Sequence, residues 1–276
     1  MCELLAMSAN VPTDLRFSFS GLIRRAGDTG PHTDGWGIAF HDGRGCRVFH
    51  DPAPGAASPL AAFLREHPIK SRVAVSHVRR ANRGAVGVAN THPFLRELWG
   101  RWWAFAHNGQ LRGVKRWPLG HYRPIGTTDS EYAFCWLLGE LRARFARMPG
   151  EARLCRTIEE LARRLAGLGT FNAVLTDGTR LYAYGSTRLA WLTRRAPFGP
   201  ACLVDEDLQV DFAEETTPHD VVTIVATRPL TRNENWIPVD PGTLVVFRDG
   251  ERVALPPKRT SGASRAAAPE RAAAAA

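Results

Sequence analysis

The stretch Cys2-Glu3-Leu4-Leu5-Ala6-Met7 directly follows Met1 and combines a cysteine at position 2 with an apolar run. An initiator methionine is readily removed when the next side chain is as small as that of cysteine. The mature chain would then carry a thiol and a free α-amine on one residue, with ordinary pKa values of about 8.5 and about 8. A neutral α-amine can serve as the base for a nucleophile on its own residue. A cysteine at position 2 indicates a catalytic nucleophile only if the chain also contains the other residues of a catalytic site.

Four further segments supply polar residues next to apolar ones. They are Ser76-His77-Val78-Arg79-Arg80-Ala81, Asn90-Thr91-His92-Pro93-Phe94, Trp103-Ala104-Phe105-Ala106-His107-Asn108-Gly109-Gln110 and Gly126-Thr127-Thr128-Asp129-Ser130-Glu131. The third segment is typical of an apolar strand, and we expect it to end in a polar elbow. The fourth is typical of a turn that enters a long helix.

Together with Cys2, these segments resemble a class II glutamine amidotransferase domain of the N-terminal-nucleophile (Ntn) hydrolase superfamily. The resemblance runs from Cys2 to about Arg248. The Asp34-Gly35-Trp36-Gly37 turn and the stretch Arg194-Arg195-Ala196-Pro197-Phe198-Gly199 are most similar to the short bacterial YafJ-type proteins. The resemblance implies an α+β fold, the four-layer α-β-β-α sandwich of Ntn hydrolases, with one domain over residues 2–255.

The resemblance also implies the catalytic residues. Cys2 would attack the side-chain amide carbon of a γ-glutamyl compound and form a thioester, with its α-amine as the base. The side-chain amide of Asn108 and the backbone N–H of Gly109 match the oxyanion hole, where each donor typically contributes about 2.7–4 kcal/mol to lowering the barrier.

Two more residues match the substrate-binding side of the family, and we expect a third residue to line the same side. Arg79 matches the residue that pairs with the α-carboxylate, since a guanidinium can bind a carboxylate in bidentate fashion. Asp129 matches the acceptor of the α-ammonium, and His92 is assigned to the same substrate-binding wall.

Each assignment has a structural alternative. Asn108-Gly109 alone would indicate a hairpin turn, because Asn-Gly is a strong turn signal. Asp129 also fits the start of a helix with Thr128 or Asp129 as N-cap, which is compatible with a binding role. Arg79 alone, as one of 36 Lys and Arg residues, would more often be a solvated surface charge.

Histidine and cysteine spacing indicates neither a metal site nor a disulfide framework. His77, His92 and His107 lack the spacing of zinc fingers or His-Glu-x-x-His sites, so we expect packed, hydrogen-bonded neighbours of the site. Five scattered cysteines indicate reduced thiols. We predict no metal and no cofactor, and we place the other four thiols in or near the core: Cys46, Cys135, Cys155 and Cys202.

Three departures separate the chain from the larger synthases of the superfamily. Position 3 is Glu where those enzymes commonly have Gly, and position 80 is Arg where several have Trp. We also expect no second domain that would receive ammonia, as the larger synthases have. The expected activity is therefore hydrolysis of the γ-glutamyl amide bond of glutamine or a related γ-glutamyl compound. The alternatives are a γ-glutamyl peptide hydrolase of a thiol-metabolism pathway and a non-catalytic partner subunit.

Composition limits the class of protein, its expected location and its expected partners. The 276 residues are 44% hydrophobic, and no apolar stretch approaches the roughly 20 residues that span a bilayer. No signal peptide is indicated, so we expect a cytoplasmic protein. The net charge of +9 is spread through the chain rather than gathered in one stripe, which argues against nucleic-acid binding. A separate acceptor subunit or a homo-oligomer stays open, and residues 256–276 are expected to be a low-complexity, disordered tail.

Periodicity and turn residues predict two sets of strands around a helix pair. The first set is Cys2–Ser8, Trp36–Phe40, Cys46–His50, Arg72–Val78 and Trp102–His107. The second is Phe171–Thr176, Arg180–Tyr184, Leu189–Thr193, Val221–Ala226 and Thr243–Arg248. Helices are expected over Asp129–Arg147 and Leu154–Leu168, separated by Met148-Pro149-Gly150, with a shorter helix over Leu15–Ile23.

Overall fold

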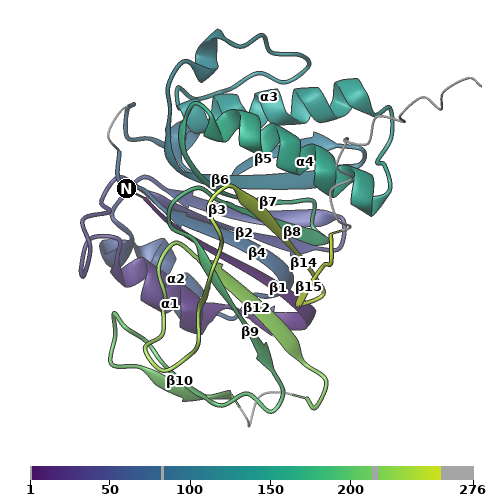
Figure 1. Cartoon of the computed structure of the whole chain (residues 1–276). Helices are drawn as coiled ribbons and strands as arrows, with labels where there is room; N and C mark the ends of the chain where they lie inside the picture. The colour runs from purple at the N-terminus through teal and green to yellow at the C-terminus, as the bar shows by residue number, and fades with distance from the viewer. Residues whose placement is uncertain (1, 82–83, 213–216, 256–276) are drawn as a thin grey trace, which may run out of the picture.

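Two sheets packed face to face, with a helix pair outside each, form the four layers of the computed structural model (Figure 1). The structure describes residues 2–81, 84–212 and 217–255. The predicted tail over 256–276 lies outside the described residues. Within these residues, no helix has the length and apolar character needed to cross a membrane.

The first sheet has seven strands in the order β13-β9-β12-β1-β4-β2-β3. Its strands are β1 (Glu3–Asp14), β2 (Trp36–Asp42), β3 (Gly45–Asp51), β4 (Lys70–Val78), β9 (Ala190–Arg195), β12 (Val221–Ala226) and β13 (Ile237–Pro238). Its outer face is covered by α1 (Arg16–Arg24) and α2 (Pro59–Glu66).

The second sheet has six strands in the order β15-β14-β8-β7-β6-β5. Its strands are β5 (Phe94–Leu98), β6 (Arg101–Leu111), β7 (Gly169–Thr176), β8 (Arg180–Gly185), β14 (Thr243–Arg248) and β15 (Glu251–Arg252). The helices α3 (Asp129–Arg144) and α4 (Glu151–Ala166) cover it on the outside. A small ribbon of β10 (Pro200–Cys202) and β11 (Gln209–Asp211) stands apart from both sheets.

The apolar opening of the chain is explained by the position of β1 inside the first sheet. Side chains alternate across a strand, and here both faces are buried. Leu5 and Met7 pack under α1 and α2, whereas Leu4 and Ala6 pack between the two sheets. Because both faces lie in the core, the strand reads as a continuous apolar run rather than an alternating one.

The predicted helices form, with ends shifted by a few residues, and Pro149 and Gly150 separate α3 from α4. The helix α2, the strand β5 and the short strands β10, β11, β13 and β15 were not predicted. A signal for α2 was present, since Ser58 caps it by accepting a hydrogen bond from Ala61 N at 3.2 Å and Pro59 occupies its first position. All five cysteines are free thiols. Two are fully buried, namely Cys135 and Cys155.

Strand directions bring distant segments to one end of the molecule. β1 runs antiparallel to β4, with Glu3 opposite Val78, so the start of the chain lies beside Arg79 and Arg80. The far end of β6, in the facing sheet, lies at the same end of the sandwich together with the first turn of α3 (Figure 1). The four segments singled out in the sequence therefore converge.

Candidate active site

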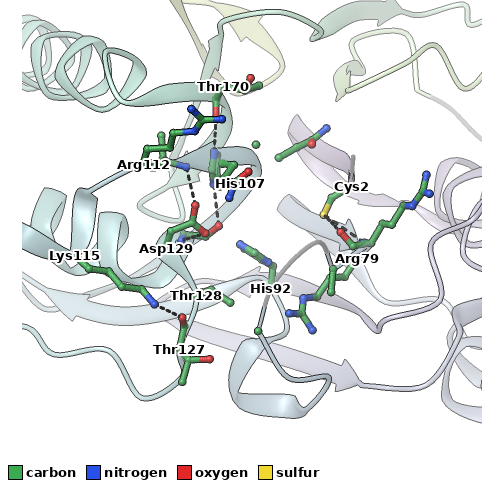
Figure 2. Close-up of a pocket in the computed structure, with 18 of the residues that line it drawn as sticks. Cys2, Arg79, His92, His107, Arg112, Lys115, Thr127, Thr128, Asp129 and Thr170 are labelled. Atoms are coloured by element: carbon green, nitrogen blue, oxygen red, sulfur yellow. Dashed lines mark hydrogen bonds between the residues drawn. The ribbon is translucent and has the colours of Figure 1, made fainter.

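A cavity of about 770 Å³ opens where these segments meet, and it is lined by side chains from both sheets. It brings together every site residue predicted from the sequence, namely Cys2, Arg79, His92, Asn108, Gly109 and Asp129. Figure 2 shows Cys2 and Arg79 on one side of this space and Asp129 on the other, with His92 between them. The space suits a ligand with charged groups at separate ends.

The half-buried thiol of Cys2 is held by the backbone of Arg80. Its Sγ lies 3.4 Å from Arg80 N and 3.5 Å from Arg80 O. Burial raises the pKa of the Cys2 thiol, and the Arg80 amide and the charge of Arg79 only partly oppose this. The thiol is therefore protonated at neutral pH, and a nucleophilic role requires a base nearby.

Asn108 and Gly109 lie within β6 and pair with Asn172 and Phe171 of β7. The expected polar elbow and the alternative hairpin turn are both wrong, because β7 continues the pairing to Leu111. The side chain of Asn108 is 1% exposed, and neither its Nδ2 nor its Oδ1 finds a hydrogen-bond partner among the described residues. Burying an amide without a hydrogen-bond partner costs free energy of folding. This amide is therefore suited to form a hydrogen bond with a ligand.

Glycine is the only residue type that this part of β6 can hold at position 109. A Cβ there would stand 1.8 Å from the carbonyl oxygen of Thr170 and 2.7 Å from Nε2 of His107. The backbone conformation of Gly109, with φ near +157°, is also unfavourable for other residues. The close approach of β7 and His107 therefore requires glycine at this point of the cavity lining.

Arg79 is not a solvated surface charge, because its side chain is only 4% exposed. Its Nη1 donates to the carbonyl oxygen of Ala85 at 3.1 Å and lies 3.5 Å from that of Asp34. Asp34 in turn accepts a hydrogen bond from Ala81 N at 2.7 Å. The Asp34 turn and the segment after β4 thus fix the guanidinium against the cavity wall.

Asp129 is the first residue of α3, as predicted, and Thr128 caps the helix by accepting a hydrogen bond from Glu131 N at 3.1 Å. The carboxylate of Asp129 accepts from Leu111 N at 2.7 Å and from Ser130 N at 3.0 Å. A carboxylate has about four lone-pair sites, so two bonds fix its orientation and leave capacity for a ligand. Helix start and cavity wall are therefore compatible.

Three buried histidines lie behind and beside the cavity. His107 is hydrogen-bonded, with Nδ1 2.8 Å from Ser130 Oγ and Nε2 3.1 Å from Thr170 O. The rings of His77 and His92 pack with centroids 4.2 Å apart, and their nitrogens make no hydrogen bond of good geometry to another described residue. The sequence-based expectation of hydrogen bonding therefore holds only for His107.

Burial keeps this cluster neutral. It lowers the pKa of His77 to about 3 and moves the pKa of His92 well below its usual range, with the neighbouring rings and Arg79 adding to the effect. The pKa of His107 is also lowered by burial, although the charge of Asp129 opposes this. Within the described ranges, no group of three or more His, Cys, Asp and Glu side chains is placed to hold a metal ion.

Several supporting residues were not anticipated from the sequence. Ser130 and Thr170 orient His107, and Asn172 Oδ1 accepts three backbone N–H groups from residues 186–188. Short polar residues of this kind are common throughout the chain. Their roles depend on the strand register, which no local sequence motif predicts.

Comparisons with known proteins agree with this geometry. The family model described as glutamine amidotransferases class-II matches residues 1–271. YafJ of Escherichia coli strain K12, whose name assigns it provisionally to the glutamine amidotransferases, is 57% identical over 92% of this chain and all of its own length. A similarly named protein of Haemophilus influenzae is 44% identical over 92% of this chain and 86% of its own.

Solved structures give the same result. The crystal structure of a predicted glutamine amidotransferase from Pseudomonas aeruginosa PA01 is 50% identical, with a TM-score of 0.75 over 92% of this chain and all of that one. The phosphoribosylpyrophosphate amidotransferase of B. subtilis is similar in fold alone, at 15% identity and a TM-score of 0.58 over 91% of this chain and 48% of that one. The α+β sandwich of the Ntn type is thus confirmed, and the chain belongs to the class II glutamine amidotransferase family.

Proposed function

We propose that this enzyme hydrolyses the γ-glutamyl amide bond of glutamine or a related γ-glutamyl compound through a thioester on Cys2. One observation carries the proposal. The cysteine thiol shares a cavity with the unpaired, buried amide of Asn108 and with the opposite charges of Arg79 and Asp129. A nucleophile, an oxyanion donor and a pair of charges for a zwitterion are the parts that this reaction needs.

In the first half of the reaction, Sγ attacks the side-chain amide carbon while the α-amine of Cys2 takes the thiol proton. Removal of Met1 is required, because the base is the amine of the same residue. The electron pair of the carbonyl moves onto oxygen, where Nδ2 of Asn108 and N–H of Gly109 stabilise the charge. The C–N bond then breaks, and the leaving amine departs with the proton, which leaves a thioester.

In the second half, a water attacks the thioester carbon and gives its proton to the α-amine. The same two donors stabilise the second oxyanion. Collapse breaks the C–S bond, glutamate is released, and the thiolate recovers the proton. The fixed donors cost no reorganisation during either step, which is why they accelerate the reaction.

The amino-acid end of the substrate would be recognised through its two charges. The guanidinium of Arg79 pairs with the α-carboxylate, and the carboxylate of Asp129 accepts from the α-ammonium. Both groups are held by backbone contacts before substrate arrives. Preorganised opposite charges favour a free glutamyl head group over an acylated or amidated one.

The test is release of glutamate from glutamine by protein whose first residue is Cys2, with Cys2→Ala as the inactive control. A γ-glutamyl chloromethyl ketone should label Cys2 stoichiometrically and block turnover, as mass spectrometry of the digested protein would show. If glutamine and γ-glutamyl amides release no glutamate and the reagent leaves Cys2 unlabelled, the proposed function is wrong.

A further inference from the structure

The wall of the active-site cavity is far more basic than the protein as a whole. The chain has 36 basic and 27 acidic side chains. Among the described residues that line the cavity, Asp129 is the only acid. The basic ones are Arg79, Arg80, Arg112, Lys115 and Arg116. The glutamyl head group accounts for Arg79 and Asp129, so four cations remain without a role in the chemistry above.

These four cations are exposed, and no described acidic side chain forms an ion pair with them. Although ion pairs are frequent elsewhere in the described residues, none of those pairs includes Arg80, Arg112, Lys115 or Arg116. Lys115 Nζ donates to the carbonyl oxygen of Thr127 at 2.6 Å, which leaves its charge uncompensated. Cations around one concave site raise the local concentration of anions and the rate at which they bind.

The four cations divide between the two ends of the cavity. Arg112 and Lys115 follow the end of β6 and lie on the side of Asp129 (Figure 2). Arg80 stands at the other end, because both its backbone N and its carbonyl oxygen contact the thiol of Cys2. The scissile bond must lie at that thiol. Of the four, Arg80 is therefore the one whose main chain lies beside the scissile bond, and its side chain is exposed.

Free ammonia would give Arg80 nothing to bind. If glutamine were the physiological substrate, the leaving group would be a small amine without an anionic part. A cavity of about 770 Å³ is in the range that encloses drug-sized ligands and is much larger than a single amino acid requires. The positive charge of Arg80 and the unused volume of the cavity both favour a larger substrate with an acidic leaving group.

We infer that the preferred substrate is a γ-glutamyl amide whose leaving amine carries a carboxylate, as an amino acid or peptide does, and that Arg80 binds this carboxylate. The inference rests on the proposed function and specifies its substrate class. A guanidinium presents a planar pair of N–H donors to a carboxylate. Arg112, Lys115 and Arg116 add a positive potential that attracts the anion.

The experiment compares γ-glutamylglycine with γ-glutamylglycinamide, which differ only in the charge of the leaving amine. We expect kcat/KM to be about tenfold higher for γ-glutamylglycine, the effect of one charge-assisted hydrogen bond. In Arg80→Gln the ratio between the two substrates should fall to within about threefold. γ-Glutamyltaurine, whose sulfonate is also an anion, separates recognition of a carboxylate from recognition of any acidic group.

The ratio within one protein cancels general effects of a mutation on the fold. Arg72→Gln is the matched control, because Arg72 is an exposed arginine on β4 outside the cavity, and it should keep the ratio of the unmodified protein. Equal kcat/KM for the two substrates, with both hydrolysed, would overturn the inference and leave the proposed function intact. If the protein hydrolyses no γ-glutamyl compound at all, both the inference and the proposed function are wrong.

Discussion

The carboxylate of Glu3, the residue after the proposed nucleophile Cys2, is paired with the guanidinium of Arg25, with 3.0 Å between Oε2 and Nη1. Both side chains are almost fully buried. Arg25 Nε also donates to Asp205 at 2.6 Å, and Glu3 Oε1 accepts from Arg228 Nε at 2.6 Å. The residue that departs from the Gly of larger synthases therefore fixes the start of β1, and with it the position of Cys2.

Replacing Glu3 by Gln should lower the free energy of unfolding by about 3 kcal/mol, because it leaves buried arginine charge partly unpaired. Urea-induced unfolding would measure the loss. Glu251→Gln is the control, since its pair with Arg195 is exposed and should contribute less than about 1 kcal/mol. Similar losses in the two variants would show that the Glu3 network does not hold β1.

Replacing Asn108 by Ala should lower kcat by about 10²–10³ and change KM little, because the oxyanion exists only near the transition state. Steady-state kinetics with glutamine would measure both constants. The side chain makes no hydrogen bond to a described residue, so thermal stability should change much less than turnover. A raised KM with an unchanged kcat would instead assign Asn108 to ground-state binding.

A protein with glutamate inserted between Met1 and Cys2 should retain its initiator methionine and lose about 10²–10⁴ in turnover, the usual contribution of a general base. The burial that raises the pKa of the thiol makes this base necessary. Intact mass would establish the N-terminus, and thiol titration would show that Cys2 is still accessible. Normal turnover in this form would exclude the α-amine as base.

Asp129→Asn should reduce kcat/KM for glutamine by about tenfold to a hundredfold, since a hydrogen bond to a charged group contributes roughly 1.5–3 kcal/mol. Asparagine keeps an oxygen for Leu111 N, so β6 and α3 should stay joined. N-acetylglutamine, which lacks the ammonium, should be a poor substrate of the unmodified protein. Equal rates on glutamine and N-acetylglutamine would show that Asp129 does not read the amine.

The free energy of unfolding should fall as the pH is lowered, because the buried histidines are neutral in the folded protein and become protonated when the chain unfolds. The folded-state pKa of His77 is about 3 and its unfolded pKa about 6.5, so the unfolded chain binds more protons between these values. The contribution of the neutral ring is fully present above pH 6.5 and is lost towards pH 3, at up to about 1.4 kcal/mol per pH unit. His77→Phe should flatten this slope in chemical unfolding measured across that range. Identical slopes would contradict a buried neutral His77.

The order of the motifs along the chain is enough to indicate much of the site, because a cysteine at position 2 combined with the later Arg79 and Asp129 motifs is a pattern with few other interpretations. The helices α3 and α4 are also predictable, since apolar recurrence and the Pro149-Gly150 break are local signals. By contrast, Asn108-Gly109 has the local pattern of a turn. Its conformation depends on β7, where Asn172 lies 64 residues further along the chain and the pairing extends past Gly109.

The sequence by itself therefore determined the residue types of the site and the apolar patterns of strands and helices. The tertiary structure decided which atoms are left unpaired and where charges meet. The buried amide of Asn108 and the Glu3–Arg25 pair both depend on contacts between segments far apart in the chain. Their energies come from desolvation, which is a property of the packed layers rather than of any local stretch.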